Sequence, residues 1–167
     1  MPTNSTKSID KLLELGEGQY IEFKESFDKS IQKEIVAFAN ASGGTIYLGI
    51  SDTGILKGIG INNKLKSQIQ DIAHNCDPSI LIDLTEMDSL LVIEIPEGKN
   101  KPYSCSTGFY MRMGANSQKM TRNEILSLAI KSGKVRFDEQ ICSNFDWKDF
   151  DEDKFMYYLT LQRKWHQ

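Results

Sequence analysis

One short apolar run places the tightest limit on how this chain can fold. The segment from Thr45 to Ile50, TIYLGI, is apolar and rich in β-branched residues, and it carries no charge. It follows a glycine pair at positions 43 and 44 and is closed by the turn sequence Asp52-Thr53-Gly54. A run of this composition between turn residues is typical of a buried strand. The sequence therefore predicts a strand inside a core, with other elements covering it.

Helix and strand patterns alternate along the rest of the chain. Apolar residues at helical spacing predict helices over residues 8–15, 28–41, 63–74 and 121–130. Residues 20–24 alternate, so we expect Ile21 and Phe23 to face the core and Glu22 and Lys24 to lie on the opposite, non-core face. Further strands are predicted over 80–85 and 90–95, which form one hairpin, and over 103–107 and 109–113, which form a second pair around Gly108.

Composition excludes several classes of protein. Of 167 residues, 40% are hydrophobic and 26% charged, with 12 Gly and 4 Pro, which rules out collagen, a long disordered tract and a membrane-embedded protein. No apolar run is long enough to cross a bilayer, and the first residues lack a signal-peptide pattern, so we expect a cytoplasmic location and no membrane partner. Cys76, Cys105 and Cys142 are widely spaced, which favours reduced thiols over a disulfide framework.

Charge is distributed unevenly. The net charge is -3, but residues 98–137 contain 8 Lys and Arg against 1 acidic residue. In this segment basic side chains, which reach phosphates, interleave with aromatic ones, which stack on unpaired bases. Charge alone favours a solvated basic face over a phosphate-binding one. Alternation would place Phe109, Met111 and Met113 in a core and Tyr110 and Arg112 outside. The candidate nucleic-acid-binding residues are Lys99, Lys101, Tyr110, Arg112, Lys119 and Arg122.

Carboxylates lie in or beside two of the predicted strands. Glu17, Glu22 and Asp52, with Lys24 nearby, could converge where the strands end. Oxygen ligands for Mg²⁺ or Mn²⁺ beside a cation are what a divalent-metal phosphodiesterase needs. The residues alone favour a simpler interpretation, in which Glu22 and Lys24 form a surface ion pair and Asp52 stabilises a turn.

A zinc site is a weaker hypothesis. His74, Cys76 and Cys105 supply three candidate ligands, whereas a closed structural site needs four, so unrelated thiols are favoured.

Three segments together resemble a known family. The sequences GEGQYIEFKES, EIVAFANASGGTIYLGISDTGILKGI and KPYSCSTGFYMRMGANSQKMTRNEI are similar to the Schlafen AlbA-type domain over about residues 10–132. This domain occurs in bacterial proteins described as transcriptional regulators or as divergent ATPase-like or helicase-like proteins. The resemblance implies an α+β fold, in which helices pack on a mixed sheet, and a role in binding DNA or RNA.

The resemblance also bears on the candidate sites. Some Schlafen proteins cut structured RNA with three acidic residues, and Glu17, Glu22 and Asp52 stand at positions similar to that trio. The family's zinc site uses a His-x-Cys followed by paired cysteines, but Ser104 stands here where one Cys is expected, which argues against zinc. An ATPase activity has no Walker motif to support it. Members of the family use paired domains, so the resemblance implies a two-fold homodimer.

We therefore expect an AlbA-type nucleic-acid-binding domain over residues 8–133. Residues 134–167 would be an acidic linker and a helix that begins near Asp151, the start of a further domain missing from this chain. The expected function is a DNA-binding module of a transcriptional regulator, with no cofactor assigned, Mg²⁺ or Mn²⁺ left open and Zn²⁺ not expected. A divalent-metal-dependent endoribonuclease that uses Mg²⁺ or Mn²⁺ is the first alternative, and a protein-interaction module is the second.

Overall fold

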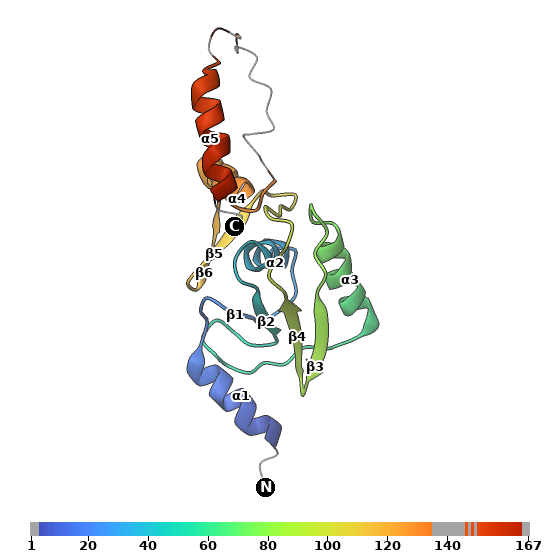
Figure 1. The fold of residues 1–167 in the computed structure, drawn as a ribbon. Helices are drawn as coiled ribbons and strands as arrows, with labels where there is room; N and C mark the ends of the chain where they lie inside the picture. Colours follow the sequence, from blue (N-terminus) through green and yellow to red (C-terminus); the bar gives the residue numbers. More distant parts are fainter. Residues whose placement is uncertain (1–3, 135–145, 147, 149, 165–167) are drawn as a thin grey trace. The chain divides into compact units, whose positions relative to one another are not determined.

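The computed structural model describes residues 4–134, 146, 148 and 150–164, and it divides into two compact units, Met1–Val135 and Arg136–Gln167 (Figure 1). Most of the expected acidic linker, residues 135–145 with 147 and 149, lies outside the described residues, as does Cys142. The first unit contains the segments on which the candidate sites depend.

A mixed four-stranded sheet forms the centre of the described part of the first unit. Its strands are β1 (Ile21–Lys24), β2 (Gly44–Leu48), β3 (Asp83–Met87) and β4 (Leu90–Ile95), in the order β1-β2-β4-β3. β1 and β2 run parallel, whereas β2 with β4 and β3 with β4 are antiparallel. The expected buried strand is confirmed, and it lies inside the sheet, where Ile46 and Leu48 are fully buried.

Helices cover both faces of this sheet, which makes the fold α+β as expected. On one face, α2 (Ile31–Asn40) and α3 (Asn63–His74) share a core with β2 and β4 that includes Ile35, Phe38 and Ile69. On the other face, α1 (Asn4–Leu15) packs Ile9 and Leu12 against Phe23. The bounds of α3 agree with the helix predicted over residues 63–74. The helix begins there because the Asn62 side chain caps it by accepting the Leu65 N–H at 2.9 Å.

The predicted orientation of the β1 side chains is correct for Phe23 and wrong for Glu22 and Lys24. Phe23 is buried as predicted, but on the α1 side. Glu22 pairs in register with Ile46 and Lys24 with Leu48, so both charged residues lie on the face that α2 covers, and Glu22 is only 5% exposed. Alternation alone separates the two faces of a strand, but it does not reveal that a second layer also covers the polar face.

The second predicted hairpin is shifted along the chain. β5 (Tyr110–Met113) pairs with β6 (Asn116–Lys119), and the turn between them contains Gly114 at φ +61°. Residues 103–107 instead run beside the end of α3, where Asp77 and Ser104 exchange two backbone hydrogen bonds of 2.9 and 2.7 Å. The last helix of the unit, α4 (Arg122–Lys131), begins with the predicted capping box of Thr121 and Glu124.

The second unit contributes one described helix, α5 (Glu152–Lys164). Its start agrees with the prediction, because Asp151 precedes it and accepts the Lys154 N–H at 3.0 Å. Phe155, Met156 and Tyr157 are all exposed. Across the described residues, no helix combines the length and apolar character that a bilayer crossing requires.

Gly43 and Gly54 offer a matched test of how tightly α2 is joined to the sheet. Both have φ +75°, but a Cβ on Gly43 would lie 2.7 Å from the Ile95 carbonyl oxygen, whereas a Cβ on Gly54 would meet nothing within 4 Å. Gly54→Ala should cost about 1–2 kcal/mol for the left-handed backbone. Gly43→Ala should cost about 1–3 kcal/mol more, because the backbone must move. Denaturant unfolding measures both, and equal losses would contradict the close approach.

Candidate functional site

A small cleft of about 270 Å³ gathers the four residues of the predicted carboxylate site. Glu17 precedes β1, Glu22 and Lys24 belong to β1, and Asp52 follows β2. Because β1 and β2 are parallel, their carboxyl ends meet at one edge of the sheet, which brings Lys24 and Asp52 to the same cleft. Glu17 reaches this cleft from before β1, where its carboxylate accepts the Phe23 N–H. Residues that the sequence analysis did not include in this site complete the lining, namely Lys33, Glu34, Arg112, Ala115, Asn116 and Ser117.

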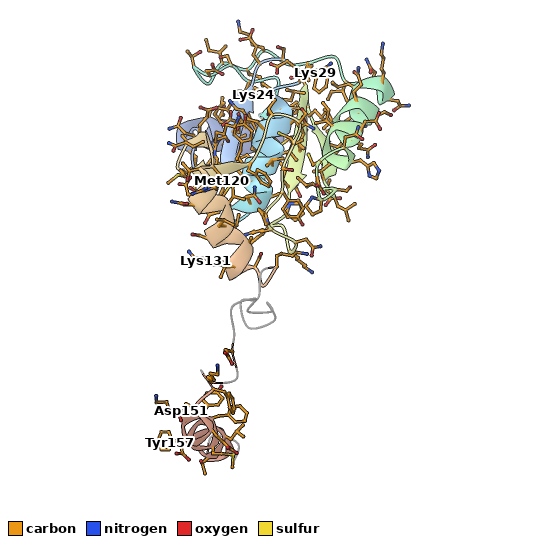
Figure 2. All side chains as sticks on the ribbon, turned by 90° about the horizontal axis from the view of Figure 1, so that it is seen from above. Lys24, Lys29, Met120, Lys131, Asp151 and Tyr157 are labelled. Atoms are coloured by element: carbon orange, nitrogen blue, oxygen red, sulfur yellow. The ribbon has the colours of Figure 1, made fainter. Side chains whose placement is uncertain are left out.

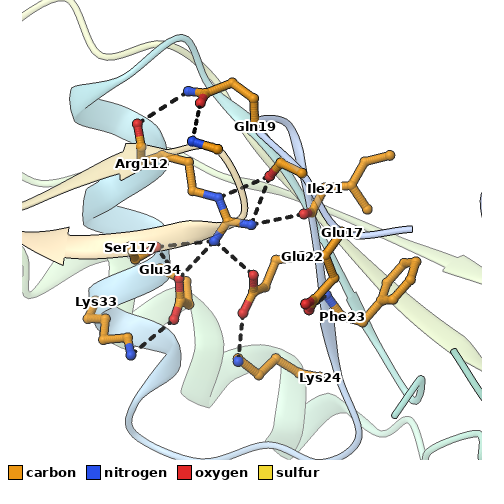
Figure 3. A network of polar contacts seen from close by, with 12 residues as sticks. Glu17, Gln19, Ile21, Glu22, Phe23, Lys24, Lys33, Glu34, Arg112 and Ser117 are labelled. Carbon is orange, nitrogen blue, oxygen red and sulfur yellow. Dashed lines mark hydrogen bonds and ion pairs between the residues drawn. The ribbon is translucent and has the colours of Figure 1, made fainter. Parts of the chain in front are cut away.

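Arg112 holds this cleft together (Figure 3). Its side chain is fully buried and reaches from β5 to the backbone before and within β1, donating to the carbonyl oxygens of Gly18 at 2.8 and 3.1 Å and of Ile21 at 3.0 Å. Its Nη1 lies 2.8 Å from Glu22 and 3.4 Å from Glu34. The guanidinium also lies over the ring of Phe38, 4.8 Å from the ring centroid.

Glu22 and Glu34 each have further partners. The second oxygen of Glu22 lies 2.7 Å from the ammonium of Lys24, and Glu34 accepts a hydrogen bond from Ser117 and lies 3.4 Å from Lys33. Among the described residues, no buried side-chain nitrogen or oxygen lacks a hydrogen-bond partner. Buried charges are tolerated only in such a fully paired arrangement.

The expected outward position of Arg112 is therefore wrong. The guanidinium is a buried partner of two carboxylates, so it is not placed to contact a phosphate on the surface. Glu34 was the available signal in the sequence. It stands in the apolar helix segment EIVAFAN, and a carboxylate in a buried helix requires a cation from elsewhere in the chain.

The charges at the rim of the cleft influence one another. Burial of its carboxyl group raises the pKa of Glu17, and the negative charges of Glu22 and Asp52 act in the same direction, although the carboxylate accepts the Phe23 N–H at 2.9 Å. Burial would lower the pKa of Lys24, but the hydrogen bond and charge of Glu22 outweigh it, so the pKa is raised. The cleft thus retains a proton on Lys24 firmly.

The donor set does not fit a preformed site for Mg²⁺ or Mn²⁺. Both oxygens of Glu22 are already engaged by cations, an ammonium and a guanidinium, which compete with a divalent ion for the same lone pairs. Within the described ranges, no three carboxylate, histidine or cysteine side chains are grouped so that they could hold a metal ion. The arrangement instead resembles a charge-paired polar core that opens at one edge.

The predicted zinc residues are similarly occupied. His74 is exposed and contacts Ser79 at 3.2 Å, Cys76 donates to the Ile72 carbonyl at 3.4 Å, and Cys105 lies 3.2 Å from the Thr107 hydroxyl. Burial raises the pKa of Cys76 to about 11, which disfavours the thiolate that zinc requires. These residues do not form a metal-ligand group in the described chain.

The predicted basic residues fall on separate surfaces. Lys99 and Lys101 line a hollow of about 570 Å³ with Lys131 and Ser132, between the segment after β4 and the end of α4. We call this hollow the Lys99 surface. Lys101 is bound to Glu97 at 2.7 Å and to the Ala41 carbonyl, whereas Lys99 and Lys131 are exposed. Lys119 and Arg122 are also exposed, and Tyr110 is partly buried beside a different hollow.

A family model and two solved structures are similar to this chain. The model of the family described as Schlafen, AlbA_2 matches residues 17–121. The DIP2311 protein of Corynebacterium diphtheriae has a similar structure, with a TM-score of 0.52 and 17% identity over 66% of this chain, and the match spans only 24% of that protein. The N-terminal domain of a RecG-related protein from Nitrosomonas europaea is 25% identical, with 72% of this chain and 95% of that domain covered and a TM-score of 0.46. No curated protein sequence matches.

Arg112 should matter for stability more than a surface arginine does. Arg112→Met leaves Glu22 and Glu34 buried without their shared cation, so we expect a loss of about 3–5 kcal/mol in the free energy of unfolding. Arg112→Lys should recover part of this loss, because an ammonium keeps the charge but not the fork geometry. The exposed Arg122→Ala is the control and should change stability by about 0.5 kcal/mol or less. Comparable losses for Arg112→Met and Arg122→Ala in chemical denaturation would contradict the buried network.

Proposed function

We propose a nucleic-acid-binding function from the premise that this chain belongs to the Schlafen AlbA_2 family, whose model matches more than half of its residues. The observation that carries the proposal is the Lys99 surface, where Lys99, Lys101 and Lys131 border one hollow. The exposed ammonium groups of Lys99 and Lys131 can contact phosphates of a polyanion, and each contact releases counterions.

The local charge balance supports this surface, because the one carboxylate that lines the hollow, that of Glu97, is paired with Lys101. In residues 98–137, the only acidic residue is Glu124, and its carboxylate is used in the capping box of α4. Lys99 and Lys131 make no ion pair within the described chain, so both are free to take phosphate partners. A positive surface of this kind also steers a polyanion toward the domain.

We further propose that the domain belongs to a DNA-binding transcriptional regulator. Contacts to phosphates position a protein on DNA but carry little sequence information. The Lys99 surface supports affinity, and specificity would have to come from other contacts. The alternative is that the Lys99 surface binds an acidic protein. Capture of such a protein that survives nuclease treatment would favour this alternative.

Endoribonuclease activity is the less favoured alternative. The cleft does gather Glu17, Glu22, Asp52 and Lys24, but Glu22 is doubly ion-paired and the donor set does not fit a divalent ion. We therefore propose binding without cutting. Fragments from transfer RNA in Mn²⁺ that an Asp52→Ala variant does not produce would reverse this order, because Asp52 is exposed at the rim and lies outside the Arg112 network.

Two lysines should set the salt dependence of binding. Lys99→Ala with Lys131→Ala should weaken the binding of duplex DNA at all sequences and reduce the slope of log K against log salt by about 2, or about 1 for each lost phosphate contact. Fluorescence anisotropy over a salt series measures both quantities. The control Lys57→Ala removes an exposed lysine outside this segment and should leave the slope nearly unchanged. An absence of binding to any duplex or single strand at low salt would refute the proposal.

Exposed apolar side chains on α4 and β5 support the proposed two-fold homodimer. Leu126 and Ile130 lie one turn apart on α4 and are 49% and 40% exposed, and Met113 is 52% exposed. A nearby hollow of about 300 Å³ is lined by Met111, Met113, Met120 and Leu128, among others. Burial of such a surface against a second copy would remove apolar area from water.

Light scattering at tens of micromolar protein should therefore give the mass of a dimer. Leu126→Glu should shift the population to monomer, because it would bury a charge at the contact. Leu81→Glu, at a residue 83% exposed on another part of the domain, is the control and should leave the dimer intact. A monomeric wild-type protein would remove the dimer from the proposal, and a dimeric Leu126→Glu variant would move its interface elsewhere.

A further inference from the structure

A second large hollow lies on the α2 and α3 side of the domain. It has a volume of about 570 Å³, within the range of small-ligand sites, and its exposed lining is mostly apolar. Phe27, Ile72 and Tyr110 provide the apolar walls. Around them stand polar side chains from the residue before the α2 N-cap, from α2 and α3, and from the segment before β5, among them Lys29, Lys33, Gln68, Asp71 and Ser106. We call it the Tyr110 hollow.

The aromatic walls are held in place before any ligand arrives. Phe27 and Tyr110 both pack partly against the main core. The Tyr110 backbone carbonyl accepts a hydrogen bond from the buried Asn40 side chain at 2.9 Å, which fixes the start of β5. A ring that is already ordered loses little conformational entropy when a flat partner stacks on it. The hollow is thus suited to a planar, aromatic group.

Charge is distributed unequally around the rim. Lys29 and Lys33 stand on the α2 side, and Asp71 stands on the α3 side. Figure 2 shows Lys29 at the same end of the domain as Lys24, with Lys131 at the opposite end. An anionic group would therefore lie toward the two lysines and away from Asp71. Gln68 and Asp71 can offer an amide and a carboxylate to hydrogen-bonding groups at the edge of a planar ligand.

Lys33 also connects this hollow with the carboxylate cleft. Its side chain lines both, and its ammonium lies 3.4 Å from Glu34 of the Arg112 network. The two hollows are therefore neighbours on either side of one lysine.

We propose that the Tyr110 hollow receives one unpaired nucleobase of a single-stranded segment, while the adjoining phosphates contact Lys29 and Lys33. This inference rests on the proposed nucleic-acid-binding function and adds a preference for unpaired bases. The base stacks on the aromatic walls, and its polar edge meets Gln68 and Asp71. A base within a duplex is already stacked and paired, so it is not available to fill the hollow. The adjacent lysines match a polyanion better than they match an apolar peptide.

The test uses a single-stranded oligonucleotide of about twelve nucleotides that carries 2-aminopurine near its centre, and the matching duplex. Tyr110→Leu removes the aromatic wall and should weaken binding of the single strand about five- to 150-fold, the range for one lost stacking contact. Tyr110→Phe keeps the ring and is the matched control, so it should bind as the wild type does. The 2-aminopurine fluorescence should change on binding to the wild type and to Tyr110→Phe, but not to Tyr110→Leu.

Ser106→Trp provides a second variant that does not alter the core. Ser106 is exposed at the rim, and an indole there would fill the hollow, so the single strand should bind more weakly and lose its fluorescence change. Thermal unfolding of each variant checks that it is folded. Unchanged affinity for the single strand in both Tyr110→Leu and Ser106→Trp would overturn the inference and assign the hollow to another occupant. Failure of the proposed function differs, because wild-type protein would then bind neither strand nor duplex at low salt.

Discussion

The buried guanidinium of Arg112 is the interaction on which the rest of the first unit depends. From one position in β5 it bonds the backbone around β1, pairs with Glu22 of that strand and with Glu34 of α2, and lies over Phe38 in the core. Arginine suits this position because its five N–H groups form a rigid fork and its charge is not lost on burial. The hairpin of β5 and β6 is thereby fastened to a sheet with which it shares no strand pairing.

The same network decides what the carboxylates can do. A carboxylate that is buried must be paired, and Glu22 is paired twice, with Arg112 and Lys24. Its oxygens are therefore engaged in holding the protein together. Glu17 and Asp52 lie at the open rim, where the raised pKa of Glu17 reflects burial and the neighbouring negative charges. The cleft is thus better understood as the exposed edge of a structural polar core than as a prepared metal centre.

Positive charge is available on two other parts of the domain. The Lys99 surface lies between the segment after β4 and the end of α4. Beside the Tyr110 hollow, Lys29 lies just before α2 and Lys33 lies in its first turn. The first can contact a phosphate backbone without regard to sequence, and the second can combine phosphate contact with stacking on a base. Together they suit a nucleic acid that has both a regular backbone and an unpaired segment.

Local patterns in the sequence determined the elements with strong signals, and tertiary structure decided the rest. The apolar run at Thr45 to Ile50, the helix from Asn63 to His74 and the Thr121 capping box were predictable because turn residues, apolar spacing and caps act within a few residues. The approach of Asp52 to the end of β1 was also predictable, because parallel strands end at the same edge of a sheet. The burial of Arg112, the shifted hairpin and the covered face of β1 were not. They arise from contacts between residues such as Arg112 and Glu34, which are 78 positions apart, and no local period in the sequence records a pairing at that separation.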